Sequence, residues 1–200
     1  MQRVSLQDKR ESLQQALLRV IARDGIEQAT VRNIAAEANI NPAAVSYAFS
    51  GKDELMMTLH LALQADVYAV VEGAVQGCTT IEEAITNMAK AYFEHTLRDP
   101  DRQRAHMELT LSALARAESR EIAKLQYEGY IKQLADAVSK LDCGGISKAE
   151  ITLIARMGLA LMDGVIVQYL STRNQSACKK TLNLGVDLLL NHCKTLRKKS

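Results

Sequence analysis

The side chains of this sequence best suited to hold another molecule are gathered between Thr30 and Lys52. This stretch offers hydroxyl, amide and ammonium groups, which can hydrogen-bond phosphate oxygens, together with several small Ala side chains. From Ala38 to Gly51 no residue carries a charge, so nothing there would repel a phosphate or block close approach to a groove. The residue types therefore point to non-covalent contact with a nucleic acid.

The first half of this stretch predicts a short helix. Apolar residues recur there at helical spacing, which turns one face inward; they are Val31, Ile34, Ala35 and Ala38. Thr30 precedes them and can cap free backbone N–H groups of the first turn. Asn39 follows where the chain must turn, because Asn tolerates the left-handed conformation better than most residues. We expect Ile40 to enter the core after this corner.

The second half predicts another short helix. Asn41 is a good N-cap, and Pro42 is favoured at the first helical position. Val45 and Phe49 share one face, while the outer face carries small or hydrogen-bonding residues, namely Pro42, Ala43, Ala44, Ser46 and Tyr47. Two short helices with such a corner match the helix-turn-helix pattern, whose second helix enters the major groove of DNA. On spacing alone, a helix pair inside an ordinary helical core is the alternative.

The elements that must position this stretch are also helical. Apolar residues form 48% of the 200 residues, with only two prolines, and no long stretch alternates as a strand does, so we predict an all-α fold. About nine helices are expected, the longer ones at 5–24, 52–76, 119–141, 148–171 and 175–196. The helix from Lys52 would span roughly 30 Å or more, which suits a lever between two domains.

The last two helices predict self-association. The helix over 148–171 is apolar nearly all round, and the helix over 175–196 has apolar residues at 4-3-4-3 spacing. A chain this short has little left to cover both helices, so we infer a four-helix interface with a second copy. A monomer covered by its own earlier helices is the alternative. The predicted interface residues are Ile154, Leu161, Val165, Leu182, Val186, Leu189, Cys193 and Leu196.

Several other classes of function find no support in the sequence. The four cysteines and four histidines are scattered without metal-ligand spacing, so we expect no metal, no cofactor and reduced thiols in the cytoplasm. There is no phosphate-binding Gly-rich loop and no nucleophile elbow, so we do not expect an enzyme. No signal peptide and no apolar run of roughly 18 residues is present, so no membrane segment is expected. The net charge of +2 argues against a general nucleic-acid coat.

At these positions the sequence resembles the TetR-type transcriptional repressors. The residues that carry the resemblance are Thr30, Ile34, Ala35, Ala38, Ile40, Val45, Tyr47, Phe49, Lys52 and Leu55. The match covers about the first quarter of the chain, and Met162-Asp163-Gly164 is also similar to a segment common in that family. The sequence departs from the pattern at the corner, where Asn39 stands in place of the usual Gly, and at Ser46 and Ala48.

The resemblance implies a DNA-binding domain over residues 1–52 and a ligand-binding and dimerisation domain over residues 53–200. A homodimer would bind a near-palindromic operator of double-stranded DNA, and a small-molecule inducer would release it. Thr30, Tyr47 and Lys52 would hold phosphates, with Asn41 nearby, whereas Ala43, Ala44 and Ser46 would lie against base edges. Pro42 shares that outer face, and Arg32 is a further DNA-contact candidate.

An inducer pocket should be mostly apolar with a few converging polar groups. The candidates lie on the expected helices between residue 81 and residue 171, and they are Met88, Tyr92, His106, Met107, Tyr127, Tyr130, Met157, Leu161 and Gln168. For any one of them, ordinary core packing is the alternative. The sequence does not identify the inducer, and it does not show whether the protein represses or activates transcription. A helical protein-binding adaptor without DNA binding is the rival function.

Overall fold

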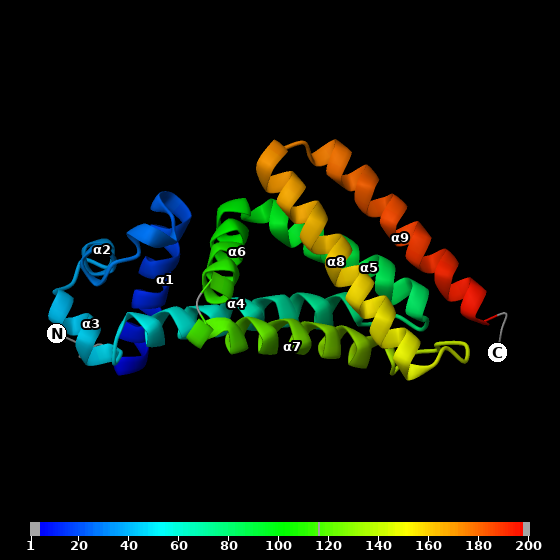
Figure 1. Ribbon diagram of the computed structural model, residues 1–200, viewed down its shortest axis with the longest axis horizontal. Helices are drawn as coiled ribbons and strands as arrows, with labels where there is room; N and C mark the ends of the chain where they lie inside the picture. Colours follow the sequence, from blue (N-terminus) through cyan, green and yellow to red (C-terminus); the bar gives the residue numbers. More distant parts are fainter. Residues whose placement is uncertain (1–4, 116, 198–200) are drawn as a thin grey trace. The chain divides into compact units, whose positions relative to one another are not determined.

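The computed structural model describes residues 5–115 and 117–197. Within these ranges it contains nine α-helices and two short 3-10 helices and no β-strand (Figure 1). The elements are α1 (Leu6–Asp24), η1 (Ile26–Gln28), α2 (Val31–Glu37), α3 (Pro42–Ala48), α4 (Lys52–Val75), α5 (Ile81–Arg98), α6 (Pro100–Ala115), η2 (Ala117–Ser119), α7 (Arg120–Val138), α8 (Lys148–Thr172) and α9 (Gln175–Arg197). The all-α fold predicted from the sequence is confirmed.

Polar caps set the ends of several helices. At the start of α1 the Ser5 side chain accepts a hydrogen bond from the Asp8 backbone N–H at 3.0 Å, and the Asp8 carboxylate accepts one from the Ser5 N–H. Ser147 and Glu150 form the same reciprocal pair at the start of α8. Each pair satisfies backbone donors that the first helical turn leaves without a partner.

The chain divides into two compact units. Unit 1 contains the residues up to Ala65 together with Asp99–Ala123, and unit 2 contains Asp66–Arg98 and Lys124–Ser200. α4 therefore contributes its first half to unit 1 and its second half to unit 2, and α6 completes unit 1 from the middle of the chain. This partition is drawn differently from the 1–52 and 53–200 domains predicted from the sequence, which stay a prediction.

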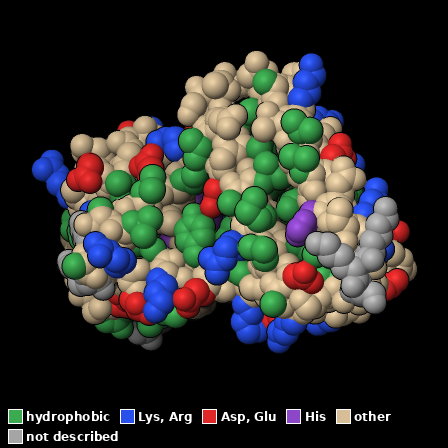
Figure 2. Space-filling view, turned by 45° about the vertical axis from the view of Figure 1, so that its right-hand side comes forward, with side chains coloured by type: hydrophobic (Ala, Val, Ile, Leu, Met, Phe, Trp, Pro, Cys, Tyr) green, Lys and Arg blue, Asp and Glu red, His purple; other side chains and the backbone are tan. Residues whose placement is uncertain are grey.

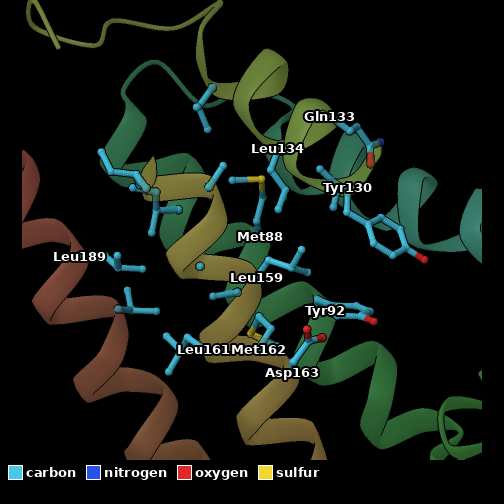
Figure 3. Close-up of a pocket in the computed structure, with 18 of the residues that line it drawn as sticks. Met88, Tyr92, Tyr130, Gln133, Leu134, Leu159, Leu161, Met162, Asp163 and Leu189 are labelled. Atoms are coloured by element: carbon cyan, nitrogen blue, oxygen red, sulfur yellow. The ribbon is translucent and has the colours of Figure 1, made fainter. Parts of the chain in front are cut away.

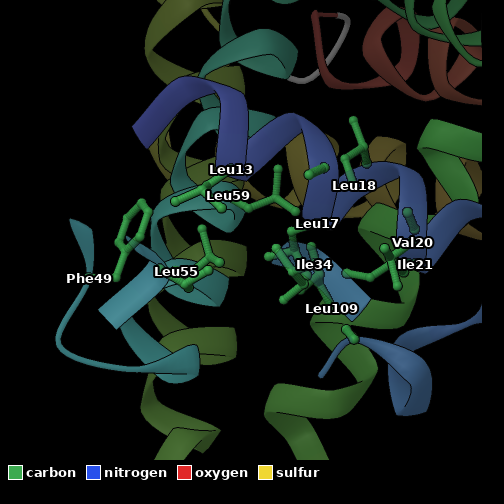
Figure 4. Close-up of a cluster of buried hydrophobic side chains, with 14 of the residues drawn as sticks. Leu13, Leu17, Leu18, Val20, Ile21, Ile34, Phe49, Leu55, Leu59 and Leu109 are labelled. Carbon is green, nitrogen blue, oxygen red and sulfur yellow. The ribbon is translucent and has the colours of Figure 1, made fainter. Parts of the chain in front are cut away.

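Unit 1 is built around α1 and a single apolar cluster (Figure 4). Leu17 and Ile21 on α1 are fully buried, as is Ile34 on α2. Phe49, at the end of α3, and Leu55, on α4, close the cluster on the side of the helix-turn-helix. Burial of side chains this large contributes about 1.5–3 kcal/mol each, so the core is enough to hold the short helices α2 and α3 in place.

In unit 2, α5, α8 and α9 pack against one another (Figure 1). A close approach between α8 and α9 occurs at Gly185, where an added Cβ atom would lie 2.5 Å from both terminal methyl carbons of Leu161. Glycine at this position thus allows two helices to come nearer than any side chain would permit. Arg197 forms an ion pair of 3.0 Å with Glu82, which joins the end of α9 to the start of α5.

The outer surface mixes charge types. On the face shown in Figure 2, Lys and Arg side chains are interspersed with Asp and Glu, and hydrophobic side chains also reach the surface. Among the residues described, no helix is sufficiently long and apolar to span a membrane.

Candidate DNA-binding interface and ligand pocket

The helix-turn-helix of unit 1 is formed by α2, a tight corner and α3. The Thr30 hydroxyl accepts a hydrogen bond from the Asn33 backbone N–H at 3.2 Å, and the Asn41 side chain accepts one from the Ala43 N–H at 2.9 Å. Asn39 has φ 54°, the left-handed conformation that the corner requires. The predicted caps and corner are therefore present, and together they fix where α3 begins.

Ile40 departs from its prediction. Its side chain is 37% exposed, so it does not enter the core as expected. Its backbone N–H bonds to the Ala35 carbonyl, which completes the end of α2. The corner therefore uses this residue's backbone rather than its side chain.

The nine predicted DNA-contact residues all lie in unit 1, on or beside α2, α3 and the start of α4. Most are exposed, namely Thr30, Arg32, Asn41, Pro42, Ala43, Ser46 and Tyr47, and two are partly exposed, namely Ala44 and Lys52. Tyr47 has 79% of its surface in solvent, which is unusual for an aromatic side chain. The outer face of α3 is thus open, while Val45 and Ala48 on its inner face are buried.

A polar network that the sequence did not reveal holds the end of α3. Arg10, on α1, donates a hydrogen bond of 2.6 Å to the Ala48 carbonyl and one of 2.7 Å to the Glu54 carboxylate. Its guanidinium also lies 4.1 Å from the centre of the Phe49 ring. The other Glu54 oxygen accepts from the Ser50 backbone and hydroxyl.

These bonds favour the ionised form of the carboxyl and lower the pKa of Glu54 from 4.5 to about 2. The largest cause is the hydrogen bond from Arg10, followed by those from Ser50. The network ties the C-terminal end of α3 to α1 and α4. A pairing between residues separated by 44 positions has no local sequence signal, whereas an i, i+4 pair within one helix would have had one.

Unit 2 contains an apolar cavity of about 900 Å³, its open side included. Its walls come from the second half of α4 and from α5, α7, α8 and α9; they are Val67, Val71, Ile85, Met88, Ala89, Tyr92, Tyr130, Gln133, Leu134, Val138, Ile154, Ala155, Gly158, Leu159, Leu161, Met162, Asp163, Val186 and Leu189. A mostly apolar wall with a few polar groups is typical of a small-molecule site.

The structure brings some of the predicted pocket residues to this cavity and not others. Met88, Tyr92, Tyr130 and Leu161 line it. Tyr127 is not part of the wall, but its hydroxyl bonds to the lining residue Asp163. His106 and Met107 lie on α6 in unit 1, where His106 meets His60 edge to face.

Met157 and Gln168 are exposed on α8 and do not line the cavity. Their only similarity to the lining residues of α8 is that they lie on the same helix. Because α8 is apolar nearly all round, its sequence could not indicate which side faced the cavity.

Asp163 is the acidic residue of the cavity wall. It accepts a hydrogen bond of 3.1 Å from the Tyr127 hydroxyl. Burial raises the pKa of the Asp163 carboxyl, and this hydrogen bond opposes the rise. Figure 3 shows Asp163 and Tyr92 toward the same side of the cavity, with Leu189 on the opposite side.

The predicted dimer residues are mostly buried within the single chain. Ile154, Val165, Leu182, Val186, Cys193 and Leu196 are covered by contacts between α8, α9 and α5, and the remaining two, Leu161 and Leu189, line the cavity. They therefore do not form a free surface. The exposed stripes are one or two positions away on each helix, at Leu153, Met157, Ala160, Gly164 and Val167 on α8 and at Ala177, Thr181, Leu184, Leu188 and Asn191 on α9.

Comparisons with known proteins agree with this arrangement. Residues 14–58, which hold the helix-turn-helix, match the family model described as bacterial regulatory proteins, tetR family. A nicotine-responsive transcriptional repressor of Paenarthrobacter nicotinovorans is 28% identical over 92% of this chain and 97% of its own length. The transcriptional regulator BetI of Brucella melitensis is 24% identical over 80% and 79%.

Solved structures share the whole fold. A transcriptional regulator from Pseudomonas aeruginosa PAO1 superposes with a TM-score of 0.79 at 23% identity, over 98% of this chain and 97% of that one. The family model over residues 14–58 and the named relatives together support a helix-turn-helix DNA-binding regulator of the TetR type.

Proposed function

We propose that this regulator is a repressor that binds a near-palindromic DNA operator as a homodimer and is released by a small molecule. The observation that carries the proposal is the outer face of α3, which is uncharged, lined with small side chains and mostly exposed beside the 79% exposed Tyr47. A helix with this surface can approach base edges in the major groove without steric or electrostatic hindrance.

The proposed DNA contacts divide into two kinds. Thr30, Tyr47 and Lys52, with Asn41 beside them, would hold phosphates and set the register of the protein on the duplex. The bases would be contacted by Ala43, Ala44 and Ser46, where Ala methyl groups can meet thymine methyls. The small number of positive charges in this set means that few phosphates are neutralised, so the salt dependence of binding should be modest.

The homodimer would form through the exposed stripes of α8 and α9. Each stripe keeps a 4-3-4-3 spacing, which places its residues along one edge of a helix that can pack lengthwise on another. Leu184 and Leu188 are each 62% exposed, and Leu153 and Met157 are more than half exposed. Binding to a palindromic operator requires the dimer to present its two α3 helices to half-sites about 34–36 Å apart.

Release would act through α4. Its second half supplies Val67 and Val71 to the cavity wall, while its first half supplies Leu55 and Leu59 to the core of unit 1. A ligand that binds one form of unit 2 more tightly would therefore act on a helix that is continuous into the DNA-reading unit. The relative named as nicotine-responsive supports control by a small molecule.

The proposal is tested by operator binding over a range of salt concentrations, with an operator fragment selected from random duplexes. Lys52→Gln should lower the slope of log affinity against log salt by about 1, because one phosphate contact is lost. Lys148→Gln is the matched control, since Lys148 also opens a long helix but lies in unit 2. No selected duplex at low salt would refute DNA binding, and equal slopes for both variants would refute the Lys52 contact.

A further inference from the structure

The cavity of unit 2 carries a carboxyl group on a wall that is otherwise mainly apolar. Asp163 lines it with Met162, Leu159 and Leu161 of the same helix and with Met88 of α5. In the part of the chain that the structure describes, the Tyr127 hydroxyl is the hydrogen-bond partner of this carboxyl, and no Lys or Arg forms an ion pair with it. Asp163 is half-buried. A carboxylate that is partly removed from water and has a neutral partner costs free energy, because its desolvation is not offset by an opposite charge.

Aromatic rings lie near this carboxyl on the wall of the cavity and behind it. Tyr92 and Tyr130 line the same cavity, and Tyr127 meets Tyr130 edge to face with ring centres 6.3 Å apart. The faces of aromatic rings attract cations, and they also provide apolar contact area. Figure 3 shows the rings of Tyr92 and Tyr130 on the side of the cavity where Asp163 lies.

We propose that the cavity takes an organic monocation, an amine or ammonium group on an apolar or aromatic body, with Asp163 as its counter-charge. This inference deepens the proposed function, because it names the chemical class of the inducer, and it rests on that function only for the release of DNA. The apolar wall of Met88, Leu134 and Leu159 would hold the body of the ligand. Attraction between the charged group and the faces of the Tyr rings would offset part of the hydration free energy that this group loses on binding.

The sign of the charge decides between ligand classes. An anion would have to lie beside the Asp163 carboxylate, so like charges would repel in a site of low dielectric. A neutral molecule would leave the half-buried carboxylate with the Tyr127 hydroxyl as partner and without an opposite charge. A cation both offsets the desolvation of Asp163 and gains from the rings, so the site favours it over an isosteric neutral compound.

The test measures binding to the free full-length protein by titration calorimetry, without DNA. The probes are benzyltrimethylammonium and the anion phenylacetate, each at up to millimolar concentration, and the neutral isostere 2,2-dimethylpropylbenzene up to its solubility in water. Asp163→Asn should weaken the ammonium at least about tenfold, since the charge partner is lost, and should leave the hydrocarbon within about twofold. The ratio of the ammonium affinity to the hydrocarbon affinity is compared between the wild type and Asp163→Asn. This comparison removes the difference in hydration between the two probes.

Tyr127→Phe provides a second variant if Asp163→Asn does not fold. It keeps the ring and removes the donor to Asp163, so it should weaken the ammonium several-fold and leave the hydrocarbon unchanged. The proposal is overturned if the ammonium does not bind, if phenylacetate binds as tightly, or if the variants weaken both uncharged and charged probes alike.

Operator release is measured separately. Selective ammonium binding that leaves operator affinity unchanged would overturn the proposed release mechanism while the cation site stands. Release by other compounds, with no preference for the ammonium, would overturn the cation site while the regulatory function stands.

Discussion

Glu54 is one residue whose charge has a structural consequence at the DNA-reading end of the chain. Its carboxylate accepts hydrogen bonds from Arg10 on α1 and from the Ser50 backbone N–H in the loop after α3. The bond from Arg10 to the Ala48 carbonyl then fixes the last turn of α3. Side chains outside α3 thus hold the helix that we propose to contact DNA.

The stability supplied by Glu54 should depend on pH. Its pKa is lowered from 4.5 to about 2 in the folded protein, so the contribution is fully present above about pH 4.5 and is lost as the pH falls toward 2. Urea unfolding of Glu54→Gln should show a lower free energy of unfolding than the wild type at pH 7, with a difference that shrinks between pH 4.5 and pH 2. The exposed Glu72→Gln is the control, and a difference independent of pH would contradict the network.

Single residues also show what the sequence could predict. Thr30, Asn41 and Pro42 have roles set by local backbone chemistry, and the structure confirms each one as a cap or a first helical residue. Asn39 takes the left-handed conformation although Gly is usual there. The contacts of Arg10 and Asp163 could not be predicted, because their partners are distant in sequence and only the folded chain brings them together.

At the scale of elements, periodicity predicted helices but not the neighbours that cover them. α9 has two faces with 4-3-4-3 spacing, one through Leu182 and Val186 and one through Leu184 and Leu188. The more apolar face turned out to be buried against α8 and α5 within the chain. A repeat of apolar residues shows that a helix needs a cover, but it does not show whether that cover is the same chain or a second copy.

The close approach of α8 and α9 gives an element-scale prediction. Gly185→Ala should lower the free energy of unfolding by about 1–3 kcal/mol, because its Cβ would press on Leu161 and overpack the contact. Gly73→Ala is the matched control on α4, where an added Cβ meets nothing within 4 Å, and it should stabilise by roughly 0.5–1 kcal/mol. Thermal unfolding measures both, and equal shifts would contradict the steric account.

At the scale of the whole molecule, the exposed stripes of α8 and α9 predict the oligomeric state. Leu188→Glu should convert the dimer to a monomer, because a charge would enter the apolar seam between copies. Leu125→Glu is the control, since Leu125 on α7 is 60% exposed, close to the 62% of Leu188. Sedimentation equilibrium distinguishes the two variants. A wild-type monomer, or a Leu188→Glu dimer, would contradict the proposed interface.

Loss of the dimer should also weaken operator binding. A monomer holds one half-site, so the gain from engaging two linked sites at once disappears. We expect the operator affinity of Leu188→Glu to fall at least tenfold relative to the Leu125→Glu control, measured by gel shift at constant salt. An unchanged affinity would show that one copy is enough for recognition.

Unit 1 is formed by two segments that are separated in the sequence, and this has a consequence for folding during translation. Residues up to Ala65 are synthesised first, but α6, which buries Ala105 and Leu109 in the same core as α1, is encoded about forty residues later. During translation the DNA-reading end therefore leaves the ribosome with part of its apolar core uncovered, and it must wait for α6 to close. A shortened gene product that stops after α4 would keep the recognition helix but lack that cover.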